Sequence, residues 1–168
     1  AGRLEASGQV TGATLRTDYG YDSFGRVTTK VETDLTQPEG APNRTHTTSF
    51  TYTHFDQLET YTRQLTATEN ATVRMTYDQA GNKVSETAAN GYALTESDAE
   101  WAQAVRRELG YAEAASALSE ADKQALLARY TETFVYDAEN RVIERHDALG
   151  YVWRTSYDAY GNKTSETE

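Results

Sequence analysis

Short stretches of alternating apolar and polar residues recur along this chain, and each ends at a tyrosine followed by a turn. Large apolar side chains stand two positions before several of these tyrosines, as Phe50, Met75 and Phe134 do. A period of two is typical of a half-buried β-strand. After each turn a second stretch begins with an apolar residue: Val27, Leu58, Val84 or Val142. The pattern therefore predicts repeated units of strand, tight turn and strand.

The turns share one chemistry. Asp stands at the first position in four copies and Gly or Asn three residues later: Asp22 and Gly25, Asp78 and Gly81, Asp137 and Asn140, Asp158 and Gly161. A weaker copy has Thr53 first and Asp56 three residues later. Asp at the first position of a type I turn accepts hydrogen bonds from the backbone ahead of it. Gly, Asn and Asp tolerate a positive φ. We therefore expect type I turns closed by a left-handed residue, with these residues in structural roles.

The repeated phrase resembles a known family. Internal repetition at intervals of about 20–30 residues is typical of arrays in which each unit packs against its neighbours. The phrase Tyr-Asp-x-x-Gly-(Arg/Asn) resembles the YD repeat of Rhs proteins, insecticidal toxin-complex subunits and teneurins. Asp147-Ala148-Leu149-Gly150 resembles the turn at the opposite end of such hairpins. The resemblance covers most of the chain outside residues about 93–130.

That resemblance implies a strip of antiparallel β-hairpins, which spirals into a hollow shell in the larger members. The shell encloses a toxic domain in Rhs and toxin-complex relatives and belongs to an adhesion receptor in teneurins. Many relatives end in a core segment that cleaves itself through aspartates. Nothing in this sequence matches that segment, so the resemblance assigns no catalytic residues.

The fold class that we expect is mainly β: a spiralling or solenoid-like sheet of hairpin repeats with an inserted α-helical hairpin. We divide the chain into a repeat segment at 1–92, a helical insertion at 93–130 and a second repeat segment at 131–168, all within one structural domain. Gly2-Arg3-Leu4 matches the second half of the repeat without the first. We therefore expect a stretch of a longer repeat protein, whose remainder is its first partner.

The insertion has its own composition, rich in Ala, Glu, Leu and Arg. Ser97 to Glu100 is a capping box, followed by apolar residues at helical spacing, and Gly110 is a stop signal. Ser119 to Asp122 is a second box, and it opens a helix that bears Leu126, Leu127 and Tyr130. Two amphipathic helices of this length need to pack on each other and on the sheet, because isolated short helices are marginal.

Two interpretations of the insertion stay open. It either braces the sheet or is neutral, since loop insertions are thermodynamically cheap, or it forms a partner-specific surface. The residues for the second interpretation are Trp101, Arg106 and Arg107.

Composition and charge exclude several classes of function. The formal net charge is −10, which argues against nucleic acid as a partner, because affinity for phosphate backbones comes from Lys and Arg. We expect no membrane insertion, since no apolar run is long enough to span a bilayer. The chain has no Cys, so disulfides and Cys-based metal sites are impossible. A secreted or cell-surface location of bacterial type fits these features.

Catalysis has little support in the sequence. His46, His54 and His146 are far apart and form no metal-binding pair. No Gly-x-Ser-x-Gly elbow or glycine-rich phosphate loop is present, and the Asp residues at recognisable positions are explained by turns. We therefore expect no cofactor, no metal and no catalytic residues. A carboxylate-based hydrolase is the remotest alternative.

Carbohydrate binding is the main alternative to a purely structural role. Exposed aromatic rings beside Asp, Asn and Arg stack on sugars and hydrogen-bond them, and Trp153, Tyr157, Asp158 and Tyr160 form such a group in the last unit. The competing interpretation is that the repeated tyrosines form a cross-strand ladder, in which aromatic pairs stabilise neighbouring strands. The sequence thus predicts a non-catalytic segment of a β shell or scaffold that encloses or displays other domains. The second hypothesis is a glycan-binding or cell-adhesion module, whose partner is a glycan or a cell-surface protein.

Overall fold

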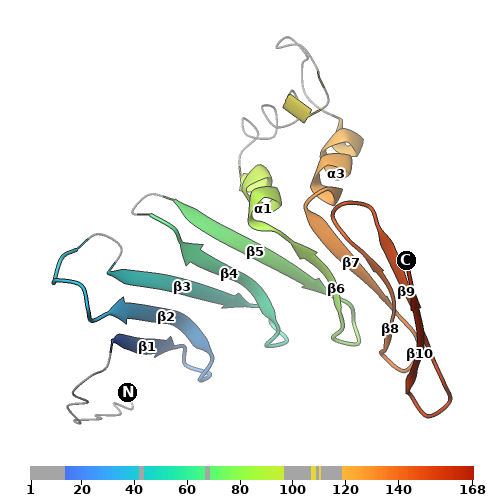
Figure 1. Cartoon of the computed structure of the whole chain (residues 1–168), viewed down its shortest axis with the longest axis horizontal. Coiled ribbons are helices and arrows are strands. Elements are labelled where there is room, and N and C mark those ends of the chain that lie inside the picture. The colour runs from blue at the N-terminus through green and yellow to red at the C-terminus, as the bar shows by residue number, and fades with distance from the viewer. Residues whose placement is uncertain (1–13, 42–43, 67–68, 97–106, 109, 111–118) are drawn as a thin grey trace.

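The computed structural model describes residues 14–41, 44–66, 69–96, 107–108, 110 and 119–168, and within them it contains one open sheet of ten antiparallel strands (Figure 1). The strands are β1 (Leu15–Tyr21), β2 (Val27–Asp34), β3 (Thr45–Tyr52), β4 (Leu58–Gln64), β5 (Asn70–Tyr77), β6 (Lys83–Thr87), β7 (Thr131–Tyr136), β8 (Val142–His146), β9 (Val152–Tyr157) and β10 (Lys163–Thr167). Their order in space is their order in the sequence. The predicted fold class, a mainly β strip of antiparallel hairpins, is confirmed.

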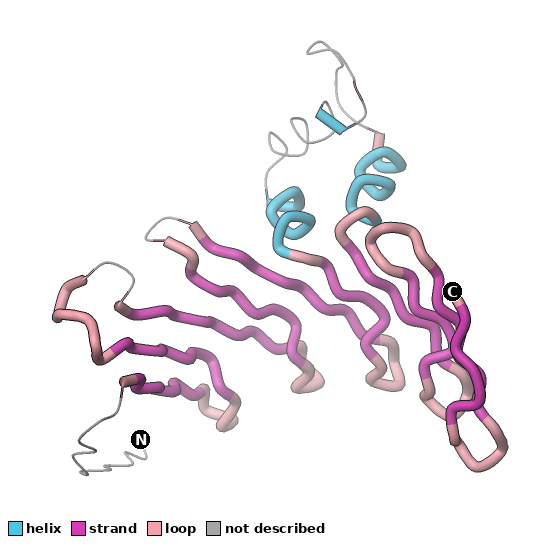
Figure 2. The backbone as a smooth tube through the Cα atoms, viewed as in Figure 1, coloured by secondary structure: helices cyan, strands magenta, loops and turns pink. Residues whose placement is uncertain are grey.

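Five hairpins make up the strip: β1–β2, β3–β4, β5–β6, β7–β8 and β9–β10. Their tight turns lie along one edge of the sheet, and the connections between hairpins lie along the other (Figure 2). In each hairpin the register shifts by a residue beside the turn, as between Thr76 and Tyr77. Such a bulge accommodates the left-handed residue that closes the turn.

The helical segment is inserted between two strands that remain paired. The helix α1 (Ala89–Glu96) follows β6, and α3 (Glu120–Ala128) precedes β7. Despite this separation in sequence, β6 pairs with β7 through Ser85↔Thr133, Glu86↔Glu132 and Thr87↔Thr131. The sheet therefore continues past the insertion without a break (Figure 1).

One helix of the insertion begins where the sequence predicts it. Ser119 is the N-cap of α3, and its side-chain oxygen accepts a hydrogen bond from the backbone N–H of Asp122 at 3.2 Å. Leu126 is 2 % exposed and anchors the helix. The first predicted helix, with its capping box and Trp101, lies outside the described residues. The structure has α1 before that position, where the sequence analysis predicted no helix.

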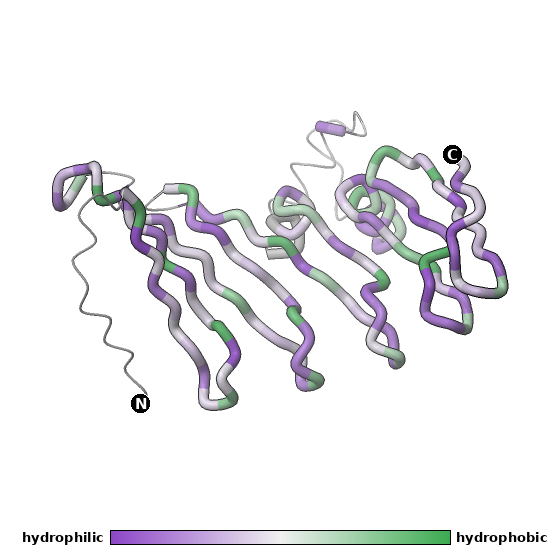
Figure 3. The backbone as a smooth tube through the Cα atoms, turned by 60° about the horizontal axis from the view of Figure 1, so that its bottom comes forward, coloured by the Kyte–Doolittle hydropathy of each residue, from purple (hydrophilic) through white to green (hydrophobic). Residues whose placement is uncertain are grey.

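The two faces of the sheet differ in chemistry. One face, the tyrosine face, bears the tyrosine that precedes each turn and the residue two positions before it, including Met75, which is 7 % exposed. The other face, the threonine face, bears mostly Thr and Ser. Four hydroxyl pairs bond across adjacent strands there: Thr51 with Thr60, Thr62 with Thr72, Thr76 with Ser85, and Thr87 with Thr131. Hydrophobic positions are scattered along the strands (Figure 3), and Met75 and Leu126 are the buried hydrophobic residues of the described ranges.

Candidate functional site

The row of turns is the most regular feature of the molecule. In the first hairpin the N–H of Asp22 donates to the carbonyl of Arg26 at 3.0 Å, and the N–H of Gly25 donates to the carbonyl of Asp22 at 3.1 Å. The same two backbone bonds recur in the other four hairpins, from residues 53, 78, 137 and 158. These two bonds, together with a positive φ at the fourth residue, are the pattern of a type I turn closed by a left-handed residue.

The left-handed position accepts residues other than glycine. Gly25, Gly81 and Gly161 occupy it in three hairpins with φ of 83°, 92° and 85°. Asp56 and Asn140 occupy it in the other two, with φ of 64° and 61°. Because Asp and Asn adopt this conformation more readily than other side chains, the repeat keeps its geometry while the residue varies.

Four of the five turns open with an aspartate, and its carboxylate is engaged within the turn. In the β7–β8 hairpin, Asp137 accepts hydrogen bonds from the backbone N–H groups of Glu139 and Arg141 and from Arg141 Nε at 2.7 Å. The backbone bond from Arg141 is the largest influence on Asp137, and together these bonds hold the pKa of its carboxyl below its ordinary value. Asp137 therefore stabilises its turn: Oδ1 accepts from the backbone, and Oδ2 accepts from the side chain of the residue after the turn.

The other turn aspartates behave alike. The side chain of Asn82 donates to Asp78 Oδ2 at 3.1 Å, and Asn162 donates to Asp158 Oδ2 at 2.9 Å. These side-chain bonds are the largest cause of the lowered pKa of both carboxyls. Desolvation alone would raise the pKa of Asp22, but the bonds from Arg26 and Phe24 outweigh it and lower the pKa.

The repeated tyrosines link each hairpin to the one before it. The hydroxyl of the tyrosine donates to the carbonyl of the residue that opens the return strand of the preceding hairpin. The bonds are Tyr52 to Val27 at 2.8 Å, Tyr77 to Leu58 at 2.8 Å, Tyr136 to Lys83 at 2.8 Å and Tyr157 to Val142 at 3.0 Å. Desolvation raises the pKa of Tyr77 and of Tyr136, since burial disfavours the phenolate.

This tyrosine ladder differs in kind from the aromatic ladder weighed in the sequence analysis. The aromatic ring pairs in the described part of the chain are His54 with Phe55 and Tyr151 with Trp153, and neither joins two of the repeated tyrosines. The ladder consists of hydroxyl-to-carbonyl bonds. A regular spacing of tyrosines in the sequence predicts a regular contact between hairpins, but it does not reveal whether the ring or the hydroxyl makes that contact.

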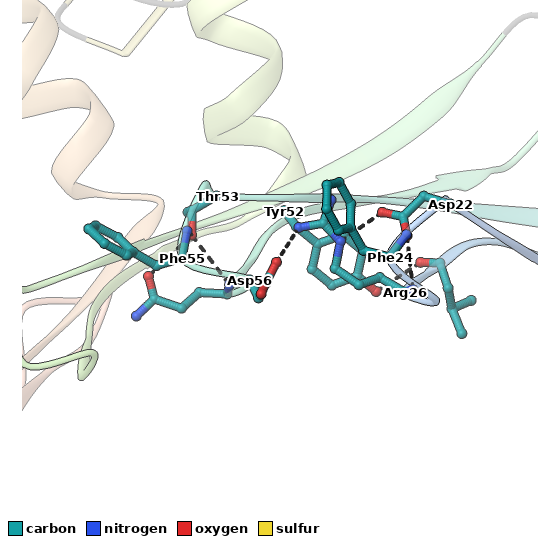
Figure 4. Close-up of polar contacts among 9 residues, drawn as sticks. Asp22, Phe24, Arg26, Tyr52, Thr53, Phe55 and Asp56 are labelled. Carbon is teal, nitrogen blue, oxygen red and sulfur yellow. Dashed lines mark hydrogen bonds and ion pairs between the residues drawn. The ribbon is translucent and has the colours of Figure 1, made fainter.

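The residue after the turn forms a second link between hairpins (Figure 4). Arg26 pairs with its own Asp22 through Nε at 2.7 Å, and its guanidinium lies 4.9 Å from the centre of the Tyr52 ring in the next hairpin. Its Nη1 also pairs with Asp56 Oδ1 at 2.6 Å. Arg141 repeats the stacking, 4.7 Å from the ring of Tyr157. Such contacts combine cation–π attraction with the charge-assisted hydrogen bond of the arginine.

Where the residue after the turn is not arginine, the same position still contacts the next turn. The side chain of Asn82 donates to Asn140 Oδ1 at 2.9 Å, and Lys83 Nζ lies 4.9 Å from the centre of the Phe134 ring. A side chain built at Gly81 would begin 3.3 Å from Gln57 Nε2. In the pairs Asn82 with Asn140 and Gln57 with Gly81, the residue after one turn therefore meets the left-handed residue of the next turn, a contact that the sequence did not predict.

The predicted sugar-binding residues lie in one hairpin but are not equally available. Tyr157 is committed to Val142 and Arg141, and Asp158 to its own turn. The guanidinium of Arg145 lies 4.1 Å from the centre of the Trp153 ring. Tyr160, at the tip of the turn, is 92 % exposed.

Tyr160 belongs to a wider group of exposed aromatic rings. Phe24 and Phe55 occupy the same position in their turns and are 80 % and 72 % exposed. All three residues belong to the tight turns between the paired strands of their hairpins. Only Tyr160 was predicted from the sequence as a binding residue, although the shared turn position relates Phe24 and Phe55 to it.

Two cavities lie where α3 crosses the threonine face. The larger, about 510 Å³, is lined by Thr131, Thr133, His146 and Leu149 among others, and the smaller, about 350 Å³, includes Arg74 and Tyr92. Gln124, Leu127 and Thr131 line both, so α3 separates them. Hydroxyl, amide and imidazole groups in these walls suit polar contacts.

The partner-binding residues of the insertion are only partly described. Trp101 and Arg106 lie outside the described residues, and Arg107 is exposed. Its neighbour Glu108 accepts hydrogen bonds from Tyr130 Oη at 2.6 Å and Arg129 Nη1 at 2.9 Å. The bond from Tyr130 is the main cause of the lowered pKa of Glu108, and it also raises the pKa of Tyr130.

No group of three or more His, Asp or Glu side chains in the described residues is arranged to hold a metal ion. His146 instead contacts Glu144, which also accepts from Arg154 Nε at 2.9 Å. The hydrogen bond with His146 is the largest cause of the lowered pKa of Glu144. None of the helices within the described ranges has the length and apolar character needed to cross a bilayer.

Comparison with known proteins identifies the repeat. A sequence model of the RHS Repeat family matches residues 136–168, which span the turns of the last two hairpins. No curated protein matches the chain. The turns from residues 22, 53 and 78 share the backbone bonds of the matched segment. The chain therefore contains an RHS repeat at residues 136–168, and this match confirms the predicted resemblance to the Rhs/YD-repeat family.

Proposed function

We propose that this chain is a non-catalytic structural segment of a larger Rhs/YD-repeat protein, in which the sheet forms part of a β shell or scaffold that encloses or displays other domains. The observation that carries the proposal is the tyrosine ladder: one hydroxyl-to-carbonyl bond joins each described hairpin to the next. A device repeated at every hairpin serves the continuity of the strip, whereas a binding site needs only a few residues in one place.

The polar groups support the same proposal. The turn aspartates that catalysis or metal binding would need are already engaged by backbone N–H groups and by the residue after the turn. RHS repeat proteins are generally structural and typically secreted or surface-associated, which fits a secreted or cell-surface location for this chain.

A scaffold must hold its two ends at a fixed separation, and this can be measured directly. The sequence has no Cys, so cysteines introduced at Arg16 in β1 and at Thr167 in β10 would be the only sites for spin labels. Pulsed electron paramagnetic resonance should give one narrow distance distribution. A broad distribution from a folded chain would contradict the scaffold proposal.

Carbohydrate binding is the second candidate, and the exposure of Tyr160, Phe24 and Phe55 favours it. The Phe24 ring lies 5.2 Å from the Arg26 guanidinium and the Phe55 ring contacts His54, yet both rings remain largely exposed, as Tyr160 does. Trp153 and Tyr157 lie against arginines and are less exposed. A glycan array with the wild-type chain and a Tyr160→Ala variant tests this candidate. Saturable binding that the variant loses without a change in melting temperature would establish it, and the absence of any binding would exclude it.

A further inference from the structure

The smaller of the two cavities beside α3 contains a cation whose hydrogen-bond donors are unused. The volume of this cavity is about 350 Å³, within the range of pockets that bind small molecules. The described residues that line it come from both helices and from the sheet: Tyr92 of α1, Gln124 and Leu127 of α3, and Arg74, Thr76, Ser85, Thr87 and Thr131 of strands β5 to β7. The two helices and the threonine face therefore build this cavity together.

Arg74 is the cation of this cavity. The strand register sets it opposite Thr60 of β4 and Thr87 of β6, on the threonine face. Its Nη2 lies 3.6 Å from Glu59 Oε1, beyond the range of about 2.7–3.2 Å for an N–H···O hydrogen bond. No atom of the described residues accepts a hydrogen bond from the Arg74 side chain. Because this side chain is 48 % exposed, its N–H donors are open to a ligand.

The hydroxyl groups of the cavity differ in which hydrogens they can still donate. Thr131 Oγ1 donates to the carbonyl of Leu127 at 2.9 Å, so Thr87 is the donor in the 3.0 Å bond between Thr87 and Thr131. Both of these hydroxyl hydrogens are therefore used. Thr76 and Ser85 bond with each other, which uses one hydrogen of the pair. The other hydrogen of that pair is left to donate to a ligand.

The charge of the cavity selects the class of ligand. Arg74 is the charged residue among the described residues that line it, and none of them is Asp or Glu, although the chain as a whole has a formal net charge of −10. The amide of Gln124 adds further N–H donors, and its side chain makes no hydrogen bond with the described residues. Leu127 adds an apolar wall. Donors, a positive charge and an apolar wall suit an anion that has an organic body.

We propose that this cavity binds a small organic acid through its carboxylate. The planar guanidinium of Arg74 pairs with the two carboxylate oxygens, the arrangement in which arginine binds carboxylates most strongly. The spare hydroxyl hydrogen of the Thr76–Ser85 pair and the amide of Gln124 donate further hydrogen bonds to the acid. The apolar body of the acid lies against Leu127. The proposal is independent of the scaffold function, because a scaffold segment functions with or without such a ligand.

The test is a titration of the intact 168-residue chain with sodium benzoate, followed by the NMR signal of the Arg74 Nε–H group. Benzoate has a carboxylate for Arg74 and an apolar ring for Leu127, and we expect a saturable shift of this signal. Acetate and inorganic phosphate lack the ring and should bind more weakly, and benzyl alcohol lacks the charge and should cause no shift. The absence of a saturable shift with benzoate would overturn the proposal, and equally tight binding of phosphate would contradict an organic ligand.

A pair of arginine variants separates this site from general attraction of anions. Arg74→Gln should lower the affinity for benzoate by at least about tenfold, because charge-assisted hydrogen bonds are lost. Arg63→Gln is the matched control: it removes the same charge from β4, but Arg63 follows Thr62 and so lies on the other face of the sheet. Calorimetry and the melting temperature are measured for both variants. Unchanged affinity in Arg74→Gln, or an equal loss in Arg63→Gln, would contradict the site.

Variants of the hydroxyl pair test the spare hydrogen. Ser85→Ala removes one hydroxyl, but the hydrogen of Thr76 then becomes available to the ligand, so the affinity for benzoate should change little. Adding Thr76→Val removes both hydroxyls, and the affinity should then fall about fivefold, the value of one hydrogen bond. Full affinity in the double variant would show that this pair does not contact the acid, and the proposed site would be wrong.

Discussion

The turns followed by arginine and those followed by an amide residue hold the next hairpin in different ways. Arg26 binds its own aspartate, stacks on Tyr52 and pairs with Asp56. In the β5–β6 hairpin two residues make the corresponding contacts. Asn82 donates to its own Asp78 and to Asn140 of the next turn, and Lys83 lies over the Phe134 ring. The bond from the tyrosine hydroxyl to a backbone carbonyl is common to both kinds.

The difference between the two kinds of turn shows that the tyrosine of the repeat is constant, whereas the residue after the turn varies. A bond to a backbone carbonyl is available whatever the neighbouring side chain is, so the tyrosine is kept. The residue after the turn needs only to donate to the aspartate and to reach the next turn, which both Arg and Asn do. Backbone contacts thus hold the hairpins together, and side-chain contacts distinguish one pair of neighbours from another.

Truncating a tyrosine of the ladder should cause the largest loss of stability, because the tyrosine hydroxyl bond is common to both kinds of turn. Tyr77→Ala loses the ring and its hydrogen bond, and we expect the free energy of unfolding to fall by about 2–4 kcal/mol. Tyr52→Ala should lose at least as much, because the guanidinium of Arg26 also loses its ring. Urea denaturation measures both. A loss below about 1 kcal/mol in either variant would show that the ladder is not what joins the hairpins.

Substitutions at the left-handed position of the turn should cause the next largest change in the free energy of unfolding. Gly81→Ala puts a Cβ on a residue with φ of 92° and close to Gln57, and we expect a loss of about 1–2 kcal/mol. Asn140→Gly is the matched variant: it relieves the left-handed conformation but removes the acceptor for Asn82. Its change in unfolding free energy should lie within about 0.5 kcal/mol of zero. A large loss of unfolding free energy in Asn140→Gly would mean that the Asn82–Asn140 hydrogen bond outweighs the cost of the left-handed conformation.

Removing only the hydroxyl isolates the rung that both kinds of turn share. Tyr52→Phe and Tyr77→Phe should each lower the free energy of unfolding by about 1 kcal/mol, the net value of one hydrogen bond. The two losses should agree, because the hydroxyl bond is independent of the residue after the turn. Double-mutant cycles with Arg26→Gln would detect a dependence, and strong coupling at Tyr52 would contradict the separation of the two links.

Lowering the pH weakens the turns from within. The pKa values of Asp78, Asp137 and Asp158 are lower in the folded chain than the ordinary value of 3.8. A lowered pKa contributes stability that is present above the ordinary pKa and is lost as the pH falls through the folded value. The melting temperature should therefore decline below about pH 4. In an Asp137→Asn variant part of this acid-dependent decline should be absent, and an unchanged decline would contradict the assignment.

Added salt should have the smallest effect on stability, and it should weaken the contact made by Arg26 more than the contact made by Asn82. The pair between Arg26 and Asp56 is charged, and the Asp56 side chain is 73 % exposed, whereas the Asn82 to Asn140 bond is neutral. Salt at about 1 M screens exposed ion pairs. Amides at residues 53–57 should exchange faster in salt, with little change at Asn140. Equal changes at both places would show that the charge of the Arg26 pair is unimportant.

Much of the strip was predictable because its signals are local. The Tyr-Asp phrase and the period-two alternation before it predicted the hairpins, and Ser119 predicted the start of α3. The helix α1 was missed because residues 89–96 include Asn90, Gly91 and Thr95, which are weak helix formers. Its placement depends on packing: a Cβ at Gly91 would lie 2.5 Å from Tyr130 Cβ and 2.9 Å from Thr87 Cγ2. We therefore attribute this helix to tertiary contacts.

The candidate site was predictable only in part. Sequence reasoning grouped Trp153, Tyr157, Asp158 and Tyr160, and the structure places them in one hairpin. It was not possible to know from sequence that arginines cover Trp153 and Tyr157 while Tyr160 stays exposed. Arg145 pairs with Trp153 across β8 and β9, which depends on the register of those strands.

The sequence by itself determined the hairpins of this protein, because every contact within a turn spans at most four residues, as between Asp137 and Arg141. The tertiary structure alone decided which side chains of neighbouring hairpins meet. Asn82 and Asn140 are separated by 58 residues and by the whole helical insertion, yet their side chains bond. Such a contact exists only because β6 and β7 pair in one register, and strand register is a property of the assembled sheet.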